Sequence, residues 1–134
     1  GLLLLTNNGS LIHALTSPLN NIEKCYQVEV DRDLSEEEMF IFENGIVIKD
    51  GNDIEFQTKP AKIKKIEDYH YFVYITEGKF HQVKRMFKHF DSNVLELKRI
   101  SFGPIKLPND LEEGKYRELT DKELESLKKL VCVK

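Results

Sequence analysis

The stretch from Glu77 to Phe90 holds the residues of this chain whose types and spacing best suit chemistry. If residues 81–90 form a helix, apolar side chains recur at the i, i+3, i+4 and i+7 spacing of a buried face: Val83, Met86, Phe87 and Phe90. Hydrogen-bond donors recur on the opposite face: His81, Lys84, Arg85 and Lys88. No acid occurs between Lys79 and Phe90, so these charges lack the Glu–Lys pairing that usually stabilises an exposed face. The pattern favours an anionic partner, either a phosphate or a carboxylate.

The structural alternative is an ordinary surface helix whose polar side is basic. Gly78 lies where a strand must turn sharply into this helix. The backbone N–H groups of the first helical turn would then add to the attraction for an anion. This placement suits an RNA backbone or a catalytic acid.

Charge is distributed unevenly along the chain, whose net charge is −3. Residues 29–38 contain six acids and one base, and residues 79–99 contain six bases and two acids. Binding to a nucleic acid depends on the local patch rather than on the total, so the net charge does not exclude an RNA partner. We interpret the acidic run as a solvated face.

Length and composition predict one domain with its own core: 134 residues, of which 40% are hydrophobic and 32% charged. The apolar stretch at residues 2–5 is too short to cross a bilayer, and we expect no membrane partner. Cys25 and Cys132 follow no disulfide or metal spacing, which favours reduced thiols and a cytoplasmic location. His13, His70 and His89 are isolated in sequence, so we predict no metal site.

Periodicity and turn residues predict an α+β domain on a mixed, largely antiparallel sheet with flanking helices. Strands are expected at residues 2–6, 26–30, 46–48, 54–56, 61–67, 71–76 and 94–102. Helices are expected at residues 11–15 after a Ser10 cap, from the Ser35–Glu38 capping box to Gly45, at 81–90, and from an Asp121 cap to Leu130.

Several spaced motifs resemble those of RsuA-type RNA pseudouridine synthases. They are Gly1 to Thr6 with Asn7-Asn8-Gly9, Lys24-Cys25-Tyr26-Gln27-Val28, Glu77 to Met86, Val94 to Arg99, and Gly103-Pro104-Ile105. Gly45 to Gly51, with Thr58-Lys59-Pro60-Ala61, resembles the enzymes of small-subunit (16S) ribosomal RNA more than their large-subunit relatives. The resemblance implies the pseudouridine synthase catalytic-domain fold. It also implies isomerisation of a uridine within RNA, without a metal or an organic cofactor.

The sequence departs from the family at the essential aspartate, which lies in an Asp-x-x-Thr-x-Gly pattern. The glycine of that pattern aligns with Gly1, so the nucleophile would precede this chain. Asp31, Asp33, Asp50 and Asp53 match no part of the motif. We therefore expect residues 1–134 to be a partial catalytic domain, without the S4-like RNA-binding domain that usually precedes it, and inactive by itself.

Two catalytic residues follow from the resemblance. Tyr26 matches the tyrosine that lies against the target base, although a core tyrosine would fit the same strand. Lys84 matches the basic position that pairs with the aspartate and would keep it ionised. The remaining expected RNA-binding residues are Lys24, Lys79, His81, Gln82, Arg85, Lys88 and Arg99.

Three other functions share some of these features. A non-catalytic RNA-binding module would use the helix at residues 81–90 but would not explain why the motifs at residues 24–28 and 77–86 occur together. A binder of an acidic protein or small anion would use the same face. A purely structural subunit would not explain why the helix carries basic residues and no acid. We expect a monomeric protein whose partner is small-subunit ribosomal RNA.

Overall fold

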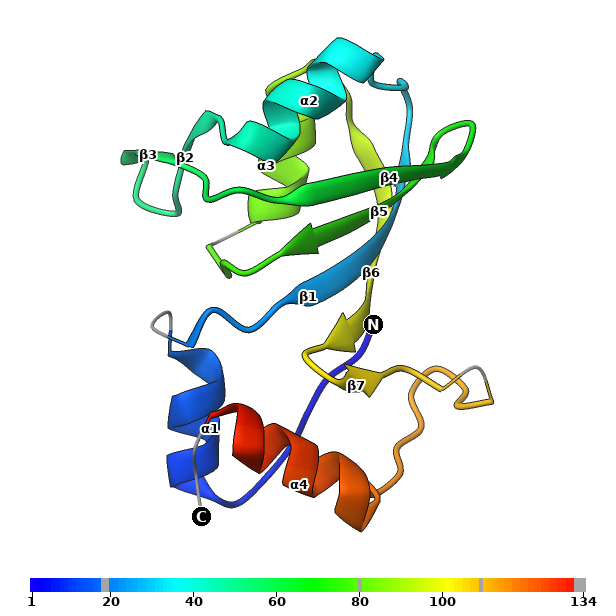
Figure 1. Cartoon of the computed structure of the whole chain (residues 1–134). Helices are drawn as coiled ribbons and strands as arrows, with labels where there is room; N and C mark the ends of the chain where they lie inside the picture. Colours follow the sequence, from blue (N-terminus) through cyan, green and yellow to red (C-terminus); the bar gives the residue numbers. More distant parts are fainter. Residues whose placement is uncertain (18–19, 80, 109, 132–134) are drawn as a thin grey trace.

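The computed structural model describes residues 1–17, 20–79, 81–108 and 110–131 (Figure 1). A five-stranded sheet in the order β4-β5-β1-β6-β7 organises the chain, and a separate hairpin joins β2 to β3. The strands are β1 (Lys24–Val30), β2 (Val47–Lys49), β3 (Glu55–Gln57), β4 (Lys62–Glu67), β5 (His70–Ile75), β6 (Val94–Phe102) and β7 (Ile105–Lys106). Each pair of neighbouring strands in this part of the chain is antiparallel. The α+β prediction is confirmed, and the described strands form an antiparallel sheet rather than the mixed, largely antiparallel one that we expected.

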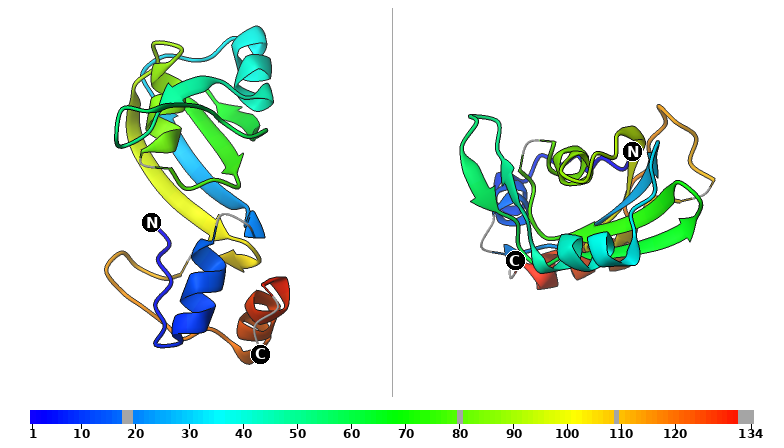
Figure 2. Two further views of the ribbon diagram at one scale, coloured as in Figure 1. Left: turned by 90° about the vertical axis from the view of Figure 1, so that its left-hand side faces the viewer. Right: turned by 90° about the horizontal axis from the view of Figure 1, so that it is seen from above.

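The sheet curls around helix α3 (Gln82–Lys88), as seen from above in Figure 2. The helices are α1 (Gly9–Thr16), α2 (Glu36–Asn44), α3 (Gln82–Lys88) and α4 (Asp121–Leu130). In Figure 1, α2 and α3 lie in the upper part with β1 to β6, and α1, α4 and β7 lie in the lower part. None of the helices in the described residues is long and apolar enough to cross a membrane.

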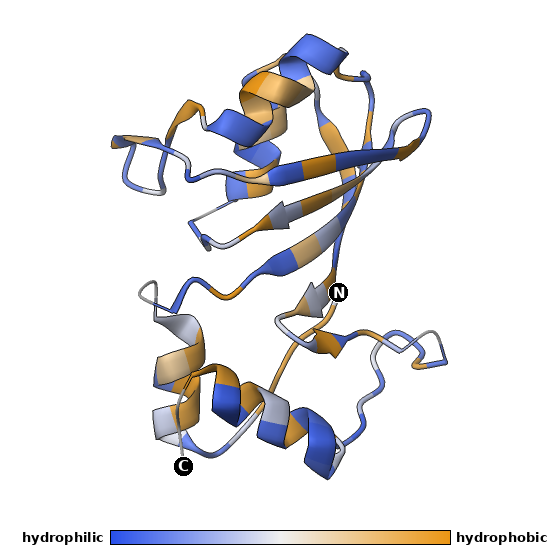
Figure 3. Cartoon of the chain, viewed as in Figure 1, coloured by the Kyte–Doolittle hydropathy of each residue, from blue (hydrophilic) through white to orange (hydrophobic). Residues whose placement is uncertain are grey.

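Two hydrophobic cores follow this division. The upper core joins the inward face of β1 and β5 to α2 and α3; its fully buried members include Val28, Tyr71, Val73, Met86 and Phe87. The lower core joins α1 and α4 to the end of β6 through Leu11, Leu127 and Phe102. Hydrophobic and polar residues both occur along α4 (Figure 3), and its Leu124 and Leu127 pack in the lower core.

Most predicted elements are present with small changes at their ends. The capping box at Ser35 and Glu38 forms as expected. Two other caps differ: Asn8 rather than Ser10 caps α1, and Thr120 rather than Asp121 caps α4. In both cases the residue just before the helix accepts a backbone N–H with its side-chain oxygen.

The strand expected at residues 2–6 is not formed. Leu2 is buried and its N–H donates to the Arg99 carbonyl at 2.7 Å, but Leu3 and Leu5 are 69% and 83% exposed. A strand needs a ladder of partners as well as an apolar run, and the chain leaves β6 after this one contact towards α1.

Candidate functional site

Tyr26 lies on the face of β1 that carries the upper core. It is half-buried and packs against that core, and its Cα partners are Val73 on β5 and Arg99 on β6. The register with β6 shifts between Cys25 and Tyr26, an irregularity of the kind that re-aims side chains beside functional sites. The predicted strand therefore places an aromatic ring on the sheet face that α3 covers.

Helix α3 has the two faces that its spacing predicts. Val83, Met86 and Phe87 are buried, whereas Lys84 and Lys88 are exposed. The polar side borders a shallow hollow of about 280 Å³, lined by His81, Lys84, Arg85, Lys88, Asn93 and Val94. The structure thus brings together the four donors expected on this face, while Tyr26 lies outside the hollow.

Lys84 differs from its basic neighbours because its side chain forms no hydrogen bond or ion pair with the described residues. Arg85 donates through Nη1 to the carbonyl oxygens of Lys49 and Asp50, at 2.6 and 2.8 Å, and so holds the β2–β3 hairpin. Lys88 donates to Asn93 Oδ1 at 3.1 Å. On this helix Lys84 is the lysine whose ammonium keeps all its hydrogen atoms for an outside carboxylate or phosphate.

Asn93 links the basic helix to the acidic run. Its backbone N–H and its side-chain amide donate to the two carboxylate oxygens of Asp31, at 2.8 and 2.9 Å. These hydrogen bonds lower the pKa of Asp31. Asp31 is exposed but hydrogen-bonded, and Asp33 and Glu38 of the same run also accept hydrogen bonds, so only part of the run matches our interpretation as a solvated face.

Gln82 and His81 form the turn that enters α3. Gln82 is 3% exposed; its Nε2 donates to Glu77 Oε1 at 3.1 Å, and its Oε1 accepts from the Lys79 N–H at 3.3 Å. His81 is exposed and has the left-handed backbone conformation, with φ of 49°. Gln82 thus shapes the turn from inside, and its predicted contact with RNA stays a prediction.

Lys24 on β1 and Arg99 on β6 lie outside the hollow of α3, and both lie near the ring of Phe102. The Lys24 Nζ and Arg99 Cζ atoms lie 5.7 and 5.3 Å from the centre of the Phe102 ring. Burial lowers the pKa of the Lys24 ammonium, the Arg99 charge lowers it further, and Glu77 opposes both. Lys24 donates to the Thr76 carbonyl oxygen at 3.3 Å. Both cations therefore lie near one ring, and the Arg99 charge acts on Lys24.

Arg99 also fixes the start of the chain, since its Nε and Nη2 donate to the Leu2 carbonyl oxygen at 3.0 and 2.7 Å. A Cβ on Gly1 would lie 2.7 Å from the Arg99 backbone nitrogen, so glycine is required for this approach. The motif glycine is therefore explained by close contact with β6.

Sequence reasoning missed three residues that lie near the predicted cations. Phe56 lies under the Lys79 ammonium, Lys59 lines the same pocket as Lys24, and Asn93 accepts from Lys88. The only available signal was the Thr58-Lys59-Pro60-Ala61 segment, which resembled the family without assigning a role to Lys59. Cys25 is a buried free thiol, and Cys132 lies outside the described residues. In the part of the chain that the structure describes, no group of three or more His, Cys, Asp or Glu residues is arranged to hold a metal ion.

Comparison with known proteins decides the family. Residues 1–89 match the model of the RNA pseudouridylate synthase family. The chain belongs to that family. It is 44% identical over 131 residues to an uncharacterised RNA pseudouridine synthase of Bacillus subtilis, which covers 95% of this chain and 53% of that protein. It is 40% identical over 129 residues to ribosomal small subunit pseudouridine synthase A of Haemophilus influenzae, which covers 96% of this chain and 54% of that protein.

A crystal structure of a pseudouridylate synthase superposes with a TM-score of 0.85 at 38% identity, over 91% of this chain and 52% of that one. The family resemblance read from the motifs is confirmed, and so is the fold. The chain spans about half the length of the pseudouridine synthases that it matches.

Proposed function

We propose that the intact protein converts a uridine of small-subunit ribosomal RNA to pseudouridine. The observation that carries the proposal is the Lys84 side chain, which is exposed on a helix whose opposite side is buried and makes no hydrogen bond or ion pair with the described residues. Such a lysine is held ready for a carboxylate or a phosphate. The family supplies the carboxylate, in an aspartate that we place in residues preceding Gly1.

In the proposed reaction the bond from C1′ of the ribose to N1 of uracil breaks and the base turns. A bond from C1′ to C5 then forms, and the proton of C5 leaves, while N1 gains a proton. Lys84 keeps the aspartate ionised and aimed, because an opposite charge nearby favours the charged form. Tyr26 lies against the base and assists removal of the C5 proton, a task suited to its flat ring and polar tip.

The base must leave the RNA stack before its atoms are accessible, at a cost of a few kcal/mol. Contacts between phosphates and the basic groups of α3 and β1 offset that cost. The RNA target is inferred from the relatives of Haemophilus influenzae and Escherichia coli, both named ribosomal small subunit pseudouridine synthase A. Monomeric state and cytoplasmic location stay predictions.

The test is tritium release from C5-labelled uridine in a small-subunit ribosomal RNA transcript. The 134-residue chain is compared with a chain extended upstream through the Asp-x-x-Thr pattern. Release by the extended chain alone supports both the reaction and the upstream nucleophile. Release by the 134-residue chain would overturn the assignment of the nucleophile, and release by neither would favour a binding module.

A further inference from the structure

A groove of about 550 Å³ lies beside the start of β1, outside the hollow of α3. Its walls come from the end of α1, from β3 and the residues after it, and from the segment that joins β5 to α3. The side chains that matter here are Lys24, Lys59, Lys79, Phe56 and Glu77. The groove and the hollow share no lining residue, so they are two separate sites.

Positive charge dominates the groove, because three lysines line it with a single acid. That acid, Glu77, already accepts from the Lys59 N–H at 2.7 Å and from Gln82 Nε2 at 3.1 Å. The Lys59 ammonium donates to Asn21 Oδ1 at 2.7 Å, and the Lys24 ammonium donates to the Thr76 carbonyl oxygen. An ammonium has three donors, so each of these lysines keeps hydrogen atoms for an anion.

Phe56 adds an aromatic surface to this charged groove. The ring is half-buried against the upper core, and the Lys79 ammonium lies 5.3 Å from its centre. Phe56 pairs with Ile48 in the hairpin that Arg85 holds at the Lys49 and Asp50 carbonyls. The ring therefore has a fixed position, with one side turned to a cation on a flexible stem.

An aromatic ring among lysines is the combination that proteins use to bind single-stranded nucleic acid. We propose that this groove binds one unpaired nucleotide of the RNA, with its base on Phe56 and its phosphate among Lys24, Lys59 and Lys79. The proposal rests on the proposed function, since it names an RNA subsite beside the reacting uridine. When the base stacks, the Lys79 ammonium leaves the ring and moves to the phosphate.

An acidic protein would bind the lysines but would gain nothing from stacking on Phe56. A variant without the ring therefore distinguishes RNA from an acidic protein as the partner. The experiment measures fluorescence anisotropy of the 134-residue chain with a fluorescein-labelled oligouridylate hexamer, and competition by inorganic polyphosphate. Phe56→Leu retains apolar bulk in the hairpin but removes the ring. We expect about tenfold weaker RNA binding and unchanged polyphosphate binding.

Lys59→Gln provides a second variant at an exposed position, independent of any effect of Phe56→Leu on folding. We expect it to weaken both ligands and to reduce the salt dependence of RNA binding by about one phosphate contact. Ile54→Ser is the matched control, because Ile54 is 61% exposed on the same hairpin and does not line the groove. Its RNA affinity should equal that of the unmodified chain.

Unchanged RNA affinity in Phe56→Leu, equal losses for RNA and polyphosphate, or no RNA binding by the unmodified chain would each overturn the proposal. Tritium release by the upstream-extended chain is measured separately. Tritium release, together with unchanged RNA affinity in Phe56→Leu, would overturn the nucleotide subsite and support the proposed reaction. Weaker RNA binding in Phe56→Leu, without tritium release by any chain, would overturn the proposed reaction and support the subsite.

Discussion

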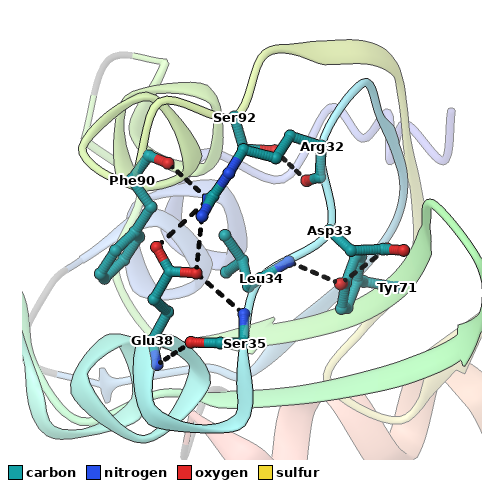
Figure 4. A network of polar contacts seen from close by, with 8 residues as sticks. All are labelled: Arg32, Asp33, Leu34, Ser35, Glu38, Tyr71, Phe90 and Ser92. Carbon is teal, nitrogen blue, oxygen red and sulfur yellow. Dashed lines mark hydrogen bonds and ion pairs between the residues drawn. The ribbon is translucent and has the colours of Figure 1, made fainter.

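The junction between β1 and α2 and the basic face of α3 both carry many charges, but they use them differently. At the junction, charged groups bind one another (Figure 4). Arg32 forms a bidentate pair with Glu38, at 3.1 and 3.2 Å, and also donates to the Phe90 carbonyl oxygen at 2.8 Å. Glu38 in turn accepts from the Ser35 N–H within the capping box.

The second half of the junction is centred on the fully buried Tyr71. Its hydroxyl accepts from the Leu34 N–H and donates to Asp33 Oδ1, both at 2.9 Å. Burial raises the pKa of Tyr71. Burial also raises the pKa of Asp33, but hydrogen bonds from the Tyr69 N–H, Tyr71 and Lys65 outweigh it, so the net pKa is lowered. The hydrogen bonds of Tyr71 and Asp33 thus stabilise the junction between β1 and α2.

On α3 and around the groove, by contrast, cations bind carbonyl oxygens, lie over rings, or extend into solvent. Arg85 contacts two carbonyls, Lys79 lies over Phe56, and the Lys84 side chain has no hydrogen bond or ion pair among the described residues. Charged groups paired with each other at the junction should therefore matter for stability, and the lysines of α3 and the groove should matter for RNA. Substitutions in each region can test this division.

The largest expected effect is on turnover, from Lys84→Met in a chain extended through the upstream aspartate. Loss of the cation leaves the aspartate without its partner, and we expect turnover to fall by about 1,000-fold. Stability in urea should change by less than about 0.5 kcal/mol, because the side chain is exposed. Tritium release and urea unfolding measure the two effects.

Lys122→Met on α4 is the matched control, since it removes the same charge from another exposed helix position. It should retain full turnover. Near-normal turnover in Lys84→Met would remove Lys84 from its role beside the aspartate, and an equal loss in both variants would indicate an effect of total charge.

The next largest effect is expected from Tyr26→Phe in the same extended chain. The ring remains for packing against the upper core, so RNA affinity should change by less than about threefold, while turnover falls by about 100-fold through loss of the hydroxyl. Single-turnover tritium release and anisotropy separate these quantities. Parallel losses of affinity and turnover would instead make Tyr26 a binding residue.

Local patterns predicted much of this structure because their causes are local. The Ser35–Glu38 capping box, the bounds of β6 and the buried side of α3 follow from neighbours within a few residues. The family motifs added roles for Tyr26 and Lys84. Their chemistry is visible in sequence only through the resemblance, since a strand tyrosine or a surface lysine is ordinary in itself.

Contacts between distant segments could not be predicted in this way. Arg85 belongs to the basic face by spacing, but it binds carbonyls at Lys49 and Asp50, which are 36 and 35 residues away. The apolar run at residues 2–5 resembles a strand, but Leu2 alone meets β6. Phe56 and Lys59 line the same groove as Lys24 only because the fold brings β3 and the residues after it to one side of this groove and the start of β1 to another.

Tyr71→Phe should have the reverse profile of Lys84→Met. It leaves the buried Leu34 N–H without an acceptor and Asp33 without one donor, so we expect a loss of about 2 kcal/mol in the free energy of unfolding. RNA affinity should be unchanged. Urea unfolding and anisotropy measure the two, and Tyr69→Phe is the control because the Tyr69 ring is 49% exposed. Equal stability in both variants would show that the Tyr71 hydroxyl is not needed at the junction.

The smallest effect is expected from Glu123, which pairs with Arg117 and lines neither the hollow of α3 nor the groove. On α4, hydrogen bonds from Arg117 and from the Thr120 N–H lower the pKa of Glu123 from 4.5 to about 2. A lowered carboxyl pKa adds stability above the ordinary value and loses it as the pH falls from about 4.5 to about 2. Glu123→Gln keeps an amide that can still accept the cap hydrogen bond, so we expect only about 0.5 kcal/mol of lost stability at neutral pH.

Urea unfolding at neutral pH and at steps below 4.5 should show a shallower pH dependence in Glu123→Gln than in the unmodified chain. Glu125→Gln on the same helix is the matched control, because the Glu125 side chain is exposed and has no hydrogen bond or ion pair among the described residues. Identical pH dependence in the two variants would place acid sensitivity elsewhere, at the other described carboxyls whose pKa is lowered: Asp31, Asp33, Glu38 and Asp50. RNA affinity should not change in either variant. A change there would break the division between charges that hold the fold and cations that bind the substrate.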